Sequence, residues 1–415
     1  METYGKILLF AMPAFLILII FEKVYGLWRG NDTLRSFDTL SSISSGITNV
    51  TKDVLGLSFV VLSYPFLLNK MAIFEVNNGF WTYLIAFLAL DFSGYWVHRI
   101  SHKNNFFWNS HLIHHSSEDF NLACALRQSI SSFVKLFTIF LLPAALMGVP
   151  VQVVATVAPI HLFVQFWYHT QHIGRMGWLE QVLVTPSHHR VHHAINPEYI
   201  DKNFAQVLII WDKLFGTFQE ELPEVKPVYG ITLPVRTWNP IKINFIHLGN
   251  LIRDCWVTSS WEDKFKIWWM PTGWRPADVS AKFPLKKIED VYSYQKYETQ
   301  AGILLKSWLW FQFFFLLGLV SYLFANIAKI GSPDIFSYGL FIFLQVYAYS
   351  ELMDLNPFAW VYELLKSAWM IFMLIQSPQW FGLNQLFSWS VYFLWSYAVF
   401  SVLITLYFCR ARIPD

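Results

Sequence analysis

Histidine is the residue type whose placement in this chain first suggests chemistry. The sequence has 13 histidines, and eleven of them lie in two short stretches, residues 98–115 and 169–193. These eleven are His98, His102, His111, His114, His115, His169, His172, His188, His189, His192 and His193. The other two, His161 and His247, stand alone, and we expect each to be a packed or solvated imidazole. Such clustering indicates a site built from imidazoles.

The spacing within the clusters places the imidazoles on shared helix faces. His98 and His102 are four residues apart, and the pattern HxxHH occurs at residues 111–115 and again at residues 189–193. Residues three and four apart are neighbours on a helix surface. We call the three segments, residues 98–102, 111–115 and 189–193, the histidine boxes. Each box lies at the end of an apolar segment, and together they predict one composite metal site.

The ligand type narrows the choice of metal. Imidazole suits zinc, iron, copper and nickel. The three cysteines, Cys124, Cys255 and Cys409, are far apart and form no CxxC pair, so neither a thiolate site nor a disulfide framework is expected. Eight or nine histidines are too many for one ion, so we expect two. Two zinc ions would serve structure or hydrolysis and two irons would serve oxygen activation, and the residues alone leave both possibilities open.

Three carboxylates are candidates for supporting the ligands. Asp91 shares a helical stripe with His98 and His102 and lies in an apolar segment, where an ionisable residue usually has a partner. A ligating histidine commonly donates its other N–H to a carboxylate. We therefore expect Asp91 to orient one of these two histidines, with a helix-interface role as the alternative. Asp201 and Asp212 follow the last box, where a solvated turn and a local cap are the alternatives.

The composition predicts a membrane protein. Apolar residues make up 55% of the 415 residues. Charged residues make up only 14%, against about 25% in soluble domains. The 30 Lys and Arg residues barely exceed the 28 Asp and Glu residues, so no basic surplus exists for nucleic acid. We therefore expect an all-α polytopic membrane protein with no nucleic-acid partner.

Apolar segments predict about seven to nine transmembrane helices, since a span needs about 20 mostly apolar residues. The expected spans cover residues 7–21, 54–68, 80–96, 133–147, 151–168, 307–328 and 386–408, and shorter ones cover residues 335–347 and 368–375. The first segment has neither the basic leader nor the small-residue cleavage site of a signal peptide, so we expect a membrane helix there.

A stretch of soluble character separates the two sets of spans. Residues 201–300 carry 13 Lys and Arg and 12 Asp and Glu residues. We therefore expect four regions: N-terminal membrane helices over 1–79, a histidine-box catalytic region over 80–220, an extramembrane cap over 221–300 and C-terminal membrane helices over 301–415. The boxes and the cap should share one face, because residues 133–168 form a hairpin that returns the chain to its starting side.

The boxes and their surroundings resemble the fatty acid hydroxylase / sterol desaturase superfamily of membrane di-iron oxidases, and within it the alkylglycerol monooxygenase family. The resemblance rests on DFSGYWVHRISH, HLIHHSSEDFNLACALRQS, QFWYHT and TPSHHRVHHAINPEYIDKNFAQVLIIWDKLFGTF. The run from HHSSEDFN to ALRQS is the most discriminating, because sterol desaturases in general share the boxes without it. The resemblance is dense over about residues 80–240.

The resemblance implies a set of site residues. The box ligands are His98, His102, His111, His114, His115, His189, His192 and His193, and His169 is a ninth histidine near the metals. His172 and His188 are additional to the pattern. Glu118, Asn121, Arg127 and Gln128 belong to the discriminating run without an assigned role. Lys103 departs from the pattern, since animal members carry an acidic residue after the first box.

The resemblance also implies an activity. Members use two irons, O₂ and tetrahydrobiopterin to hydroxylate the carbon next to the ether oxygen of alkylglycerol lipids, giving a fatty aldehyde and a glycerol derivative. The alternative is a sterol or fatty-acid hydroxylase or desaturase of the same superfamily with another electron donor. A zinc or iron transporter is disfavoured, because transporter sites lie near the bilayer midplane and the boxes lie at the ends of apolar segments.

The expected partners are an ether-lipid substrate, O₂ and membrane lipid. The expected location is the endoplasmic reticulum in a eukaryote or the inner membrane in a bacterium. The basic tail RAR after residue 408 favours the cytoplasmic side for the boxes.

Overall fold

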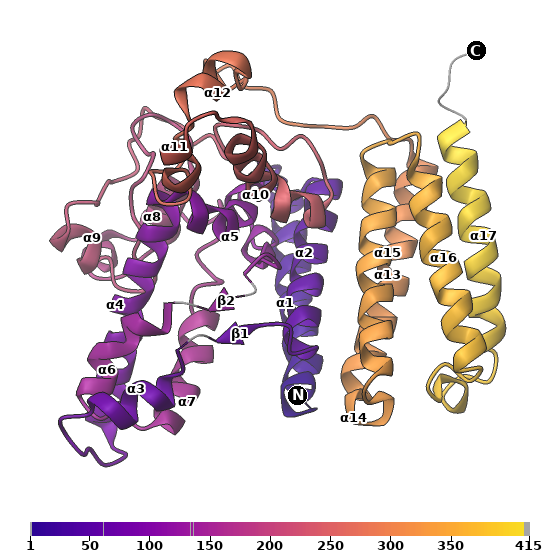
Figure 1. Cartoon of the computed structure of the whole chain (residues 1–415), viewed down its shortest axis with the longest axis horizontal. Coiled ribbons are helices and arrows are strands. Elements are labelled where there is room, and N and C mark those ends of the chain that lie inside the picture. Colours follow the sequence, from indigo (N-terminus) through magenta and orange to yellow (C-terminus); the bar gives the residue numbers. More distant parts are fainter. Residues whose placement is uncertain (1, 61, 133, 136, 411–415) are drawn as a thin grey trace.

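The computed structural model describes residues 2–60, 62–132, 134–135 and 137–410, and these are mostly helical (Figure 1). The helices of the first half are α1 (Glu2–Arg29), α2 (Ser36–Val54), α3 (Tyr64–Met71), α4 (Phe80–Lys103), α5 (Asn105–His115), α6 (Leu142–Leu146), α7 (Val151–Phe163), α8 (Pro186–His193) and α9 (Ile210–Leu214). Those of the second half are α10 (Pro240–Val257), α11 (Trp261–Lys266), α12 (Ala277–Lys282), α13 (Ile303–Ala325), α14 (Ile327–Ile330), α15 (Asp334–Met353), α16 (Ala359–Gln376) and α17 (Ser390–Arg410). Two short strands, β1 (Phe59–Val60) and β2 (Val134–Lys135), pair in parallel. The expected all-α class is confirmed.

Five of the described helices are long and apolar enough to cross a membrane. They cover Gly5–Arg29, Phe80–Lys103, Ile303–Ala325, Asp334–Met353 and Ser390–Arg410. These correspond to the expected spans at 7–21, 80–96, 307–328, 335–347 and 386–408. The expected span at 151–168 is the shorter apolar helix α7, which has Pro159 inside it and ends at Phe163. The expected span at 368–375 lies within α16.

Two expected spans are not continuous helices. Residues 54–68 hold the end of α2, strand β1 and the start of α3, because Gly56 leaves the helical conformation with φ of +67°. A new start at Ser63, whose side chain caps α3, then separates the two helices. In the segment 133–147, residues 133 and 136 lie outside the described residues. The remainder forms β2, a 3₁₀ turn at Phe137–Leu141 and the five-residue α6.

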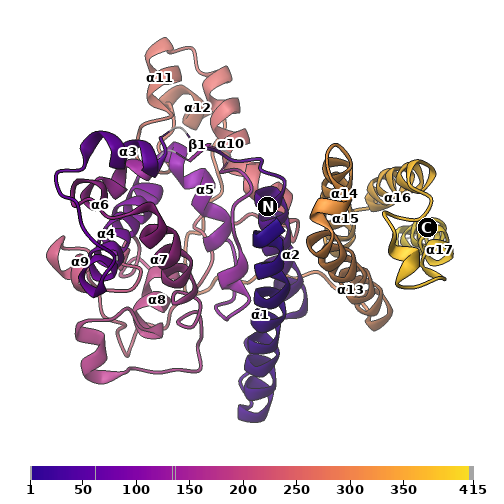
Figure 2. The ribbon, with the colours of Figure 1, turned by 90° about the horizontal axis from the view of Figure 1, so that it is seen from below.

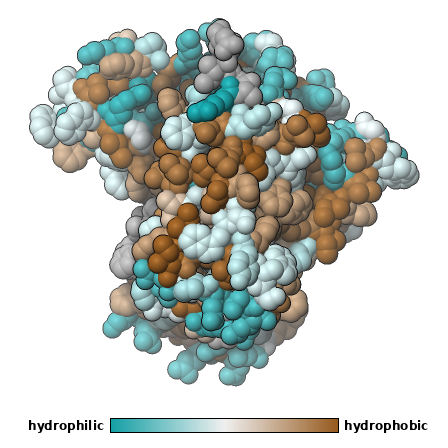
Figure 3. Space-filling model, turned by 90° about the vertical axis from the view of Figure 1, so that its right-hand side faces the viewer, coloured by the Kyte–Doolittle hydropathy of each residue, from teal (hydrophilic) through white to brown (hydrophobic). Residues whose placement is uncertain are grey.

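The histidine-bearing helices and the C-terminal helices lie on opposite sides of α1 and α2. Figure 2 shows α4, α5, α7 and α8 on one side and α13 to α17 on the other. Helix α1 contacts α13, and α2 contacts α15. The C-terminal helices expose many large apolar side chains, and Figure 3 shows hydrophobic residues spread over that side of the molecule with hydrophilic residues gathered towards its ends. This pattern suits a surface in contact with lipid.

A buried ion pair lies inside the C-terminal bundle. Lys366 Nζ lies 2.5 Å from Glu363 Oε1, and both residues are fully buried. Lys366 also donates to Ser401 Oγ on α17 at 3.1 Å and lies 4.3 Å from the ring centre of Tyr397. The pair therefore links α16 to α17 through charge and hydrogen bonds as well as through packing.

The segment between the bundles folds over the end of the molecule that carries the histidines. Helices α10, α11 and α12 lie together at that end (Figure 1). The backbone N–H of Asn105 donates to the carbonyl of Met270 at 3.0 Å, and that of Phe106 donates to Trp268 at 3.3 Å. These bonds attach the segment directly to α5.

Candidate metal centre

Local sequence fixes where the histidine helices begin and end. The Asn104 side chain accepts hydrogen bonds from the backbone N–H groups of Phe106 at 3.0 Å and Phe107 at 3.3 Å, so α5 begins directly after α4 ends at Lys103. Pro186 occupies the first turn of α8, where its fixed φ suits a helix start. The tight connection between α4 and α5 turns the first two boxes towards each other.

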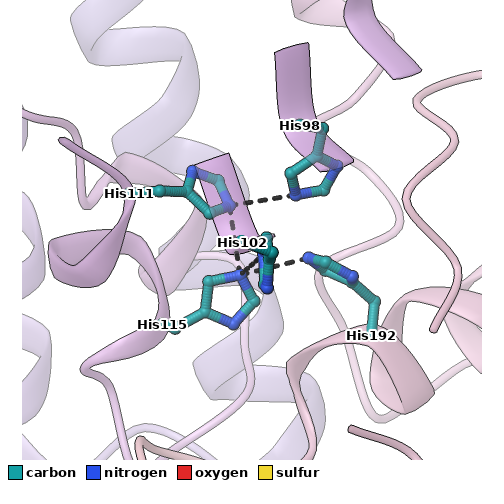
Figure 4. A group of neighbouring side chains, drawn as sticks. All are labelled: His98, His102, His111, His115 and His192. Carbon is teal, nitrogen blue, oxygen red and sulfur yellow. Dashed lines mark hydrogen bonds between the residues drawn. The ribbon is translucent and has the colours of Figure 1, made fainter. Parts of the chain in front are cut away.

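Nine histidines converge in two groups. The ligand atoms within each group lie within 4.8 Å of one another. The first group, drawn in Figure 4, is His98, His102, His111, His115 and His192. The second group is His114, His169, His189 and His193. The structure thus brings together every histidine that the resemblance assigned to the metals, although their ligation stays a prediction.

The two HxxHH boxes divide between the groups in opposite ways. In α5, His111 and His115 join the first group and His114 joins the second. In α8, His189 and His193 join the second group and His192 joins the first. Each helix therefore gives a pair to one group and a single imidazole to the other. Because of this exchange, neither group is complete without both helices.

The contacting atoms are the outer ring nitrogens. In the first group, Nε2 of His111 lies 2.9 Å from Nε2 of His98 and 3.1 Å from Nε2 of His115. In the second group, Nε2 of His189 lies 2.9 Å from Nε2 of His169 and 3.0 Å from Nε2 of His193. Apart from His114, which makes no such contact with another residue that the structure describes, the histidines of each group therefore approach one another through Nε2.

Backbone carbonyls hold the other ring nitrogen of three of these histidines. Nδ1 of His98 lies 2.7 Å from the carbonyl of Phe204. Nδ1 of His192 and Nδ1 of His169 lie 2.9 Å and 3.0 Å from the carbonyls of Lys202 and Gln165. A carbonyl only accepts, so each Nδ1 carries the hydrogen and each Nε2 presents a lone pair to the centre. Lone pairs that converge without donors fit a bound cation, and this donor set suits iron as well as zinc.

Burial keeps the clustered imidazoles outside the spans uncharged. It lowers the pKa of His169 to about 4. It also lowers the pKa of six further histidines well below the ordinary 6.5, and repulsion from neighbouring imidazoles lowers it further: His111, His114, His115, His189, His192 and His193. Neutral imidazole is the form that binds metals.

Asp91 does not make the contact that the sequence suggested. Its Oδ1 accepts from Nε2 of His161 at 2.8 Å, so it pairs with a histidine outside both groups. Its remaining hydrogen bonds come from the backbone N–H groups of Val207 at 2.9 Å and Leu208 at 3.0 Å and from the Trp211 indole at 2.9 Å. The expected hydrogen bond to His98 or His102 is wrong, because these partners occupy both oxygens of the carboxylate.

The other two carboxylates differ in how they relate to the clustered histidines, since Asp201 lies beside His102 and Asp212 contacts the loop after α8. Asp201 Oδ1 is 3.7 Å from Nδ1 of His102, and its Oδ2 is 2.6 Å from Lys103 Nζ. Asp212 accepts from the backbone N–H groups of Phe204 and Ala205, each at 2.8 Å. Asp212 lies inside α9 and fixes the loop that supplies the Phe204 carbonyl, a role that no sequence motif predicts.

The discriminating run holds the loop after α5 in place. Arg127 donates to Asp38 Oδ1 on α2 at 2.7 Å and to Ser116 Oγ at 2.8 Å. Asn121 donates to the carbonyl of Thr33 at 2.7 Å, and Glu118 accepts from the backbone N–H of Tyr297 at 2.5 Å. Gln128 donates to the carbonyl of Ala125 at 3.1 Å. These contacts fasten the second box to α2 and to the segment before α13.

The remaining histidines lie outside both groups. His247 Nε2 lies 2.8 Å from the Asn105 carbonyl. The ring of His172 packs against Tyr25 at 5.2 Å, and that of His188 packs against Phe218 at 5.5 Å. These contacts agree with the expectation that His172, His188 and His247 are not part of the ligand set.

An apolar cavity of about 620 Å³ reaches the centre from the membrane helices. Its apolar wall comes mainly from α1 and α2, with Leu162 on α7 and Leu317 on α13. Leu162 is 64% exposed, so the cavity opens beside α7 towards the outside of the bundle. The histidines that line it are His98, His111, His114, His169 and His189. We call this space the membrane cavity.

Known proteins resemble the chain over most of its length. The sequence model of the fatty acid hydroxylase family matches residues 83–217. Alkylglycerol monooxygenase of Homo sapiens is 37% identical over 364 residues, covering 86% of this chain and 80% of the relative. The Xenopus tropicalis enzyme of that name is 34% identical over the same shares, and the Danio rerio enzyme is 38% identical over 64% of this chain and 59% of its own length. No solved structure matches the chain.

Proposed function

This chain belongs to the alkylglycerol monooxygenase family of membrane enzymes, and from that premise we propose that it hydroxylates the carbon next to the ether oxygen of alkylglycerol lipids. We further propose two irons as the metals and tetrahydrobiopterin as the reductant. The likeness extends over 86% of the chain, well beyond the histidine-box region. That extent favours ether-lipid cleavage over the sterol or fatty-acid hydroxylase alternative.

The observation that carries the proposal is the membrane cavity. It joins an apolar wall to both histidine groups, since His98 and His111 belong to the first group and His114, His169 and His189 to the second. A long alkyl chain would lie against Ala11, Phe15 and the other apolar residues of α1. Its reacting carbon would then lie beside the metal centre, where oxygen chemistry takes place.

The proposed reaction is a two-electron monooxygenation. The C–H bond next to the ether oxygen becomes C–OH with one atom of O₂, and the other atom leaves as water. Tetrahydrobiopterin supplies the two electrons and two protons and leaves as a dihydropterin. The product is a hemiacetal, which breaks its C–O bond to give a fatty aldehyde and a glycerol derivative.

Iron held by the nine imidazoles would supply the activation of O₂. The surrounding chain keeps water from the reacting carbon, because the walls of the cavity are mostly apolar. Polar side chains line another part of the cavity and would hydrogen-bond the glycerol end of the lipid: Asn49, Lys52, Asp53, Ser110 and Ser132. Lys52 Nζ already donates to Asn49 Oδ1 and to the carbonyl of Ser129, each at 3.1 Å.

The protein is an integral membrane protein, and we propose how it is divided and oriented. Residues 1–79 and 301–415 would form membrane helices, 80–220 the catalytic region and 221–300 an extramembrane cap. The boxes and the cap would face the cytoplasm, in the endoplasmic reticulum of a eukaryote or the inner membrane of a bacterium. The segment carrying α10 to α12 contacts α5, which supports a common face for the two regions.

Product analysis tests the proposed reaction. Membranes that carry the protein should convert 1-O-alkylglycerol to fatty aldehyde, with uptake of O₂ and a requirement for tetrahydrobiopterin. Aldehyde formation without the pterin would overturn the proposed reductant alone. Oxidised sterol or fatty acid as the only product would favour the alternative enzyme class.

A further inference from the structure

A second cavity meets the metal centre from the cap side. It has a volume of about 280 Å³ and lies between α5, α8, α10 and residues 230–235 and 272–287. We call this space the cap cavity. The histidines that line it are His102, His115, His192 and His193 of the two groups, together with His247, which lies outside both groups.

The two cavities divide the nine clustered histidines between them. Five imidazoles line the membrane cavity and the other four line the cap cavity, and the two cavities share no lining residue. Each histidine group contributes to both cavities, since His115 of the first group and His193 of the second face the cap side. The metal centre is therefore a partition with one compartment on each side.

The cap cavity suits a small polar molecule. Its volume is less than half that of the membrane cavity, which disfavours a long lipid chain. Thr232 and Lys287 line the cap cavity and are exposed, so it opens to water beside the cap. The indoles of Trp108 and Trp274 also line it and offer flat apolar faces to a planar ring.

The polar groups that line the cap cavity differ in whether neighbouring residues already occupy their hydrogen-bonding atoms. Asp254 is already paired with Arg253 at 3.0 Å and with Arg275. Asp201 is paired with Lys103. Asn250 on α10 is half-buried, and its amide makes no hydrogen bond to another residue that the structure describes. A primary amide offers a donor and an acceptor side by side, which matches the amide edge of a pyrimidinone ring.

We propose that the cap cavity binds the reductant of the proposed reaction, a reduced pterin, with Asn250 as its recognition residue. The inference rests on the proposed function, which needs two electrons from a small soluble donor. A pterin in the cap cavity would lie beside His102, His115, His192 and His193, while the lipid occupies the membrane cavity. Electrons would then enter the centre from the aqueous side, and the substrate would enter from the bilayer.

Binding measurements on iron-loaded full-length protein in lipid nanodiscs test the inference. Equilibrium dialysis without oxygen would measure the affinity for tetrahydrobiopterin, and elemental analysis would confirm the iron content of each variant. Asn250→Leu keeps the size of the side chain and removes its amide, so it should weaken pterin binding about tenfold. Asn250→Trp fills the cavity and should abolish the binding.

Two controls separate the two cavities. Asn78→Leu makes the same change at an exposed asparagine and should leave pterin binding unchanged. Ala11→Trp narrows the membrane cavity, so it should weaken binding of 1-O-alkylglycerol and leave the affinity for the pterin unchanged. The inference would be overturned if Ala11→Trp lost pterin binding while the Asn250 variants kept it.

The two proposals can also fail separately. Aldehyde formation by wild-type protein that binds no tetrahydrobiopterin would overturn the cap-cavity site and leave the lipid reaction standing. Pterin binding that depends on Asn250, in a protein that makes no aldehyde, would support the site and contradict the proposed substrate.

Discussion

Asp91 and His161 form a buried pair between α4 and α7, with Oδ1 of Asp91 2.8 Å from Nε2 of His161. The carboxylate is fully used, because each of its oxygens accepts two hydrogen bonds. The other donors belong to the loop after α8 and to the α9 helix that follows it: Val207, Leu208 and Trp211. Asp91 therefore holds this loop against α4 without contacting a box histidine.

We expect Asp91→Asn to destabilise the segment that holds His98 by about 1–3 kcal/mol, and so to lower iron retention or turnover. In this variant an amide NH₂ group would replace one of the two carboxylate oxygens that accept hydrogen bonds. The released loop would then move the Phe204 carbonyl away from His98. Iron content and aldehyde formation measure the effect, and Asp290→Asn in the exposed cap is the control. His161→Ala should have a smaller effect, since three donors remain. Normal iron and activity in Asp91→Asn would reduce Asp91 to a packing role.

Removal of one imidazole from either group should open the metal centre. His114→Ala and His192→Ala should each abolish turnover and lower bound iron below the two ions expected per chain, with the protein still inserted in the membrane. Elemental analysis of protein purified without chelator measures the metal. His172→Ala is the matched control, because His172 lies outside both histidine groups and lines neither cavity, and it should keep both iron and activity. A single zinc with no iron, or full activity in both box variants, would contradict the assignment.

The membrane cavity predicts a positional effect along α1. Ala11→Trp should raise KM for a long-chain alkylglycerol or abolish turnover, because Ala11 lines the cavity. Ala14→Trp makes the same change on the exposed side of the helix and should leave activity near that of the wild type. Steady-state kinetics on protein of equal iron content compare the two. Equal effects from both substitutions would argue against this cavity as the lipid site.

The buried pair of the C-terminal bundle predicts a loss of stability. Lys366→Met leaves the Glu363 carboxylate buried without a counter-charge and should lower the free energy of unfolding by about 3–5 kcal/mol. Thermal unfolding in detergent measures this loss. Lys266→Met breaks the exposed pair with Glu262 and should have little effect, since exposed pairs contribute little. A stability near that of the wild type for Lys366→Met would show that the bundle rests on packing alone.

The clustering of the box histidines could be predicted from sequence because their spacing is local. A spacing of three or four residues fixes a helix face whatever the rest of the fold does. The division into two groups could not be predicted, since it depends on how α4, α5 and α8 cross. The partners of Asp91 were missed for the same reason, because Val207 lies 116 positions away.

The apolar segments predicted the spans correctly only where the backbone forms one continuous helix. The run at residues 54–68 is apolar throughout much of its length, yet Gly56 ends α2 inside it. The apolar pattern predicts a shorter, partial or re-entrant span at residues 335–347. The helix continues to Met353, since Glu351 finds partners in Asn239 at 2.8 Å and in Lys242 at 2.5 Å. A hydropathy pattern does not indicate tertiary partners of this kind.

The exchange of ligands between α5 and α8 also bears on how the protein acquires its metal. An ion in the first group would immobilise His111, His115 and His192, and so order both helices that the second group needs. The first ion bound would thus raise the affinity for the second, a positive coupling between the sites. Chains given too little iron should be a mixture of empty and doubly filled molecules, with few that hold a single ion. Turnover should then rise in proportion to iron content, whereas independent filling would make it rise with the square of the occupancy.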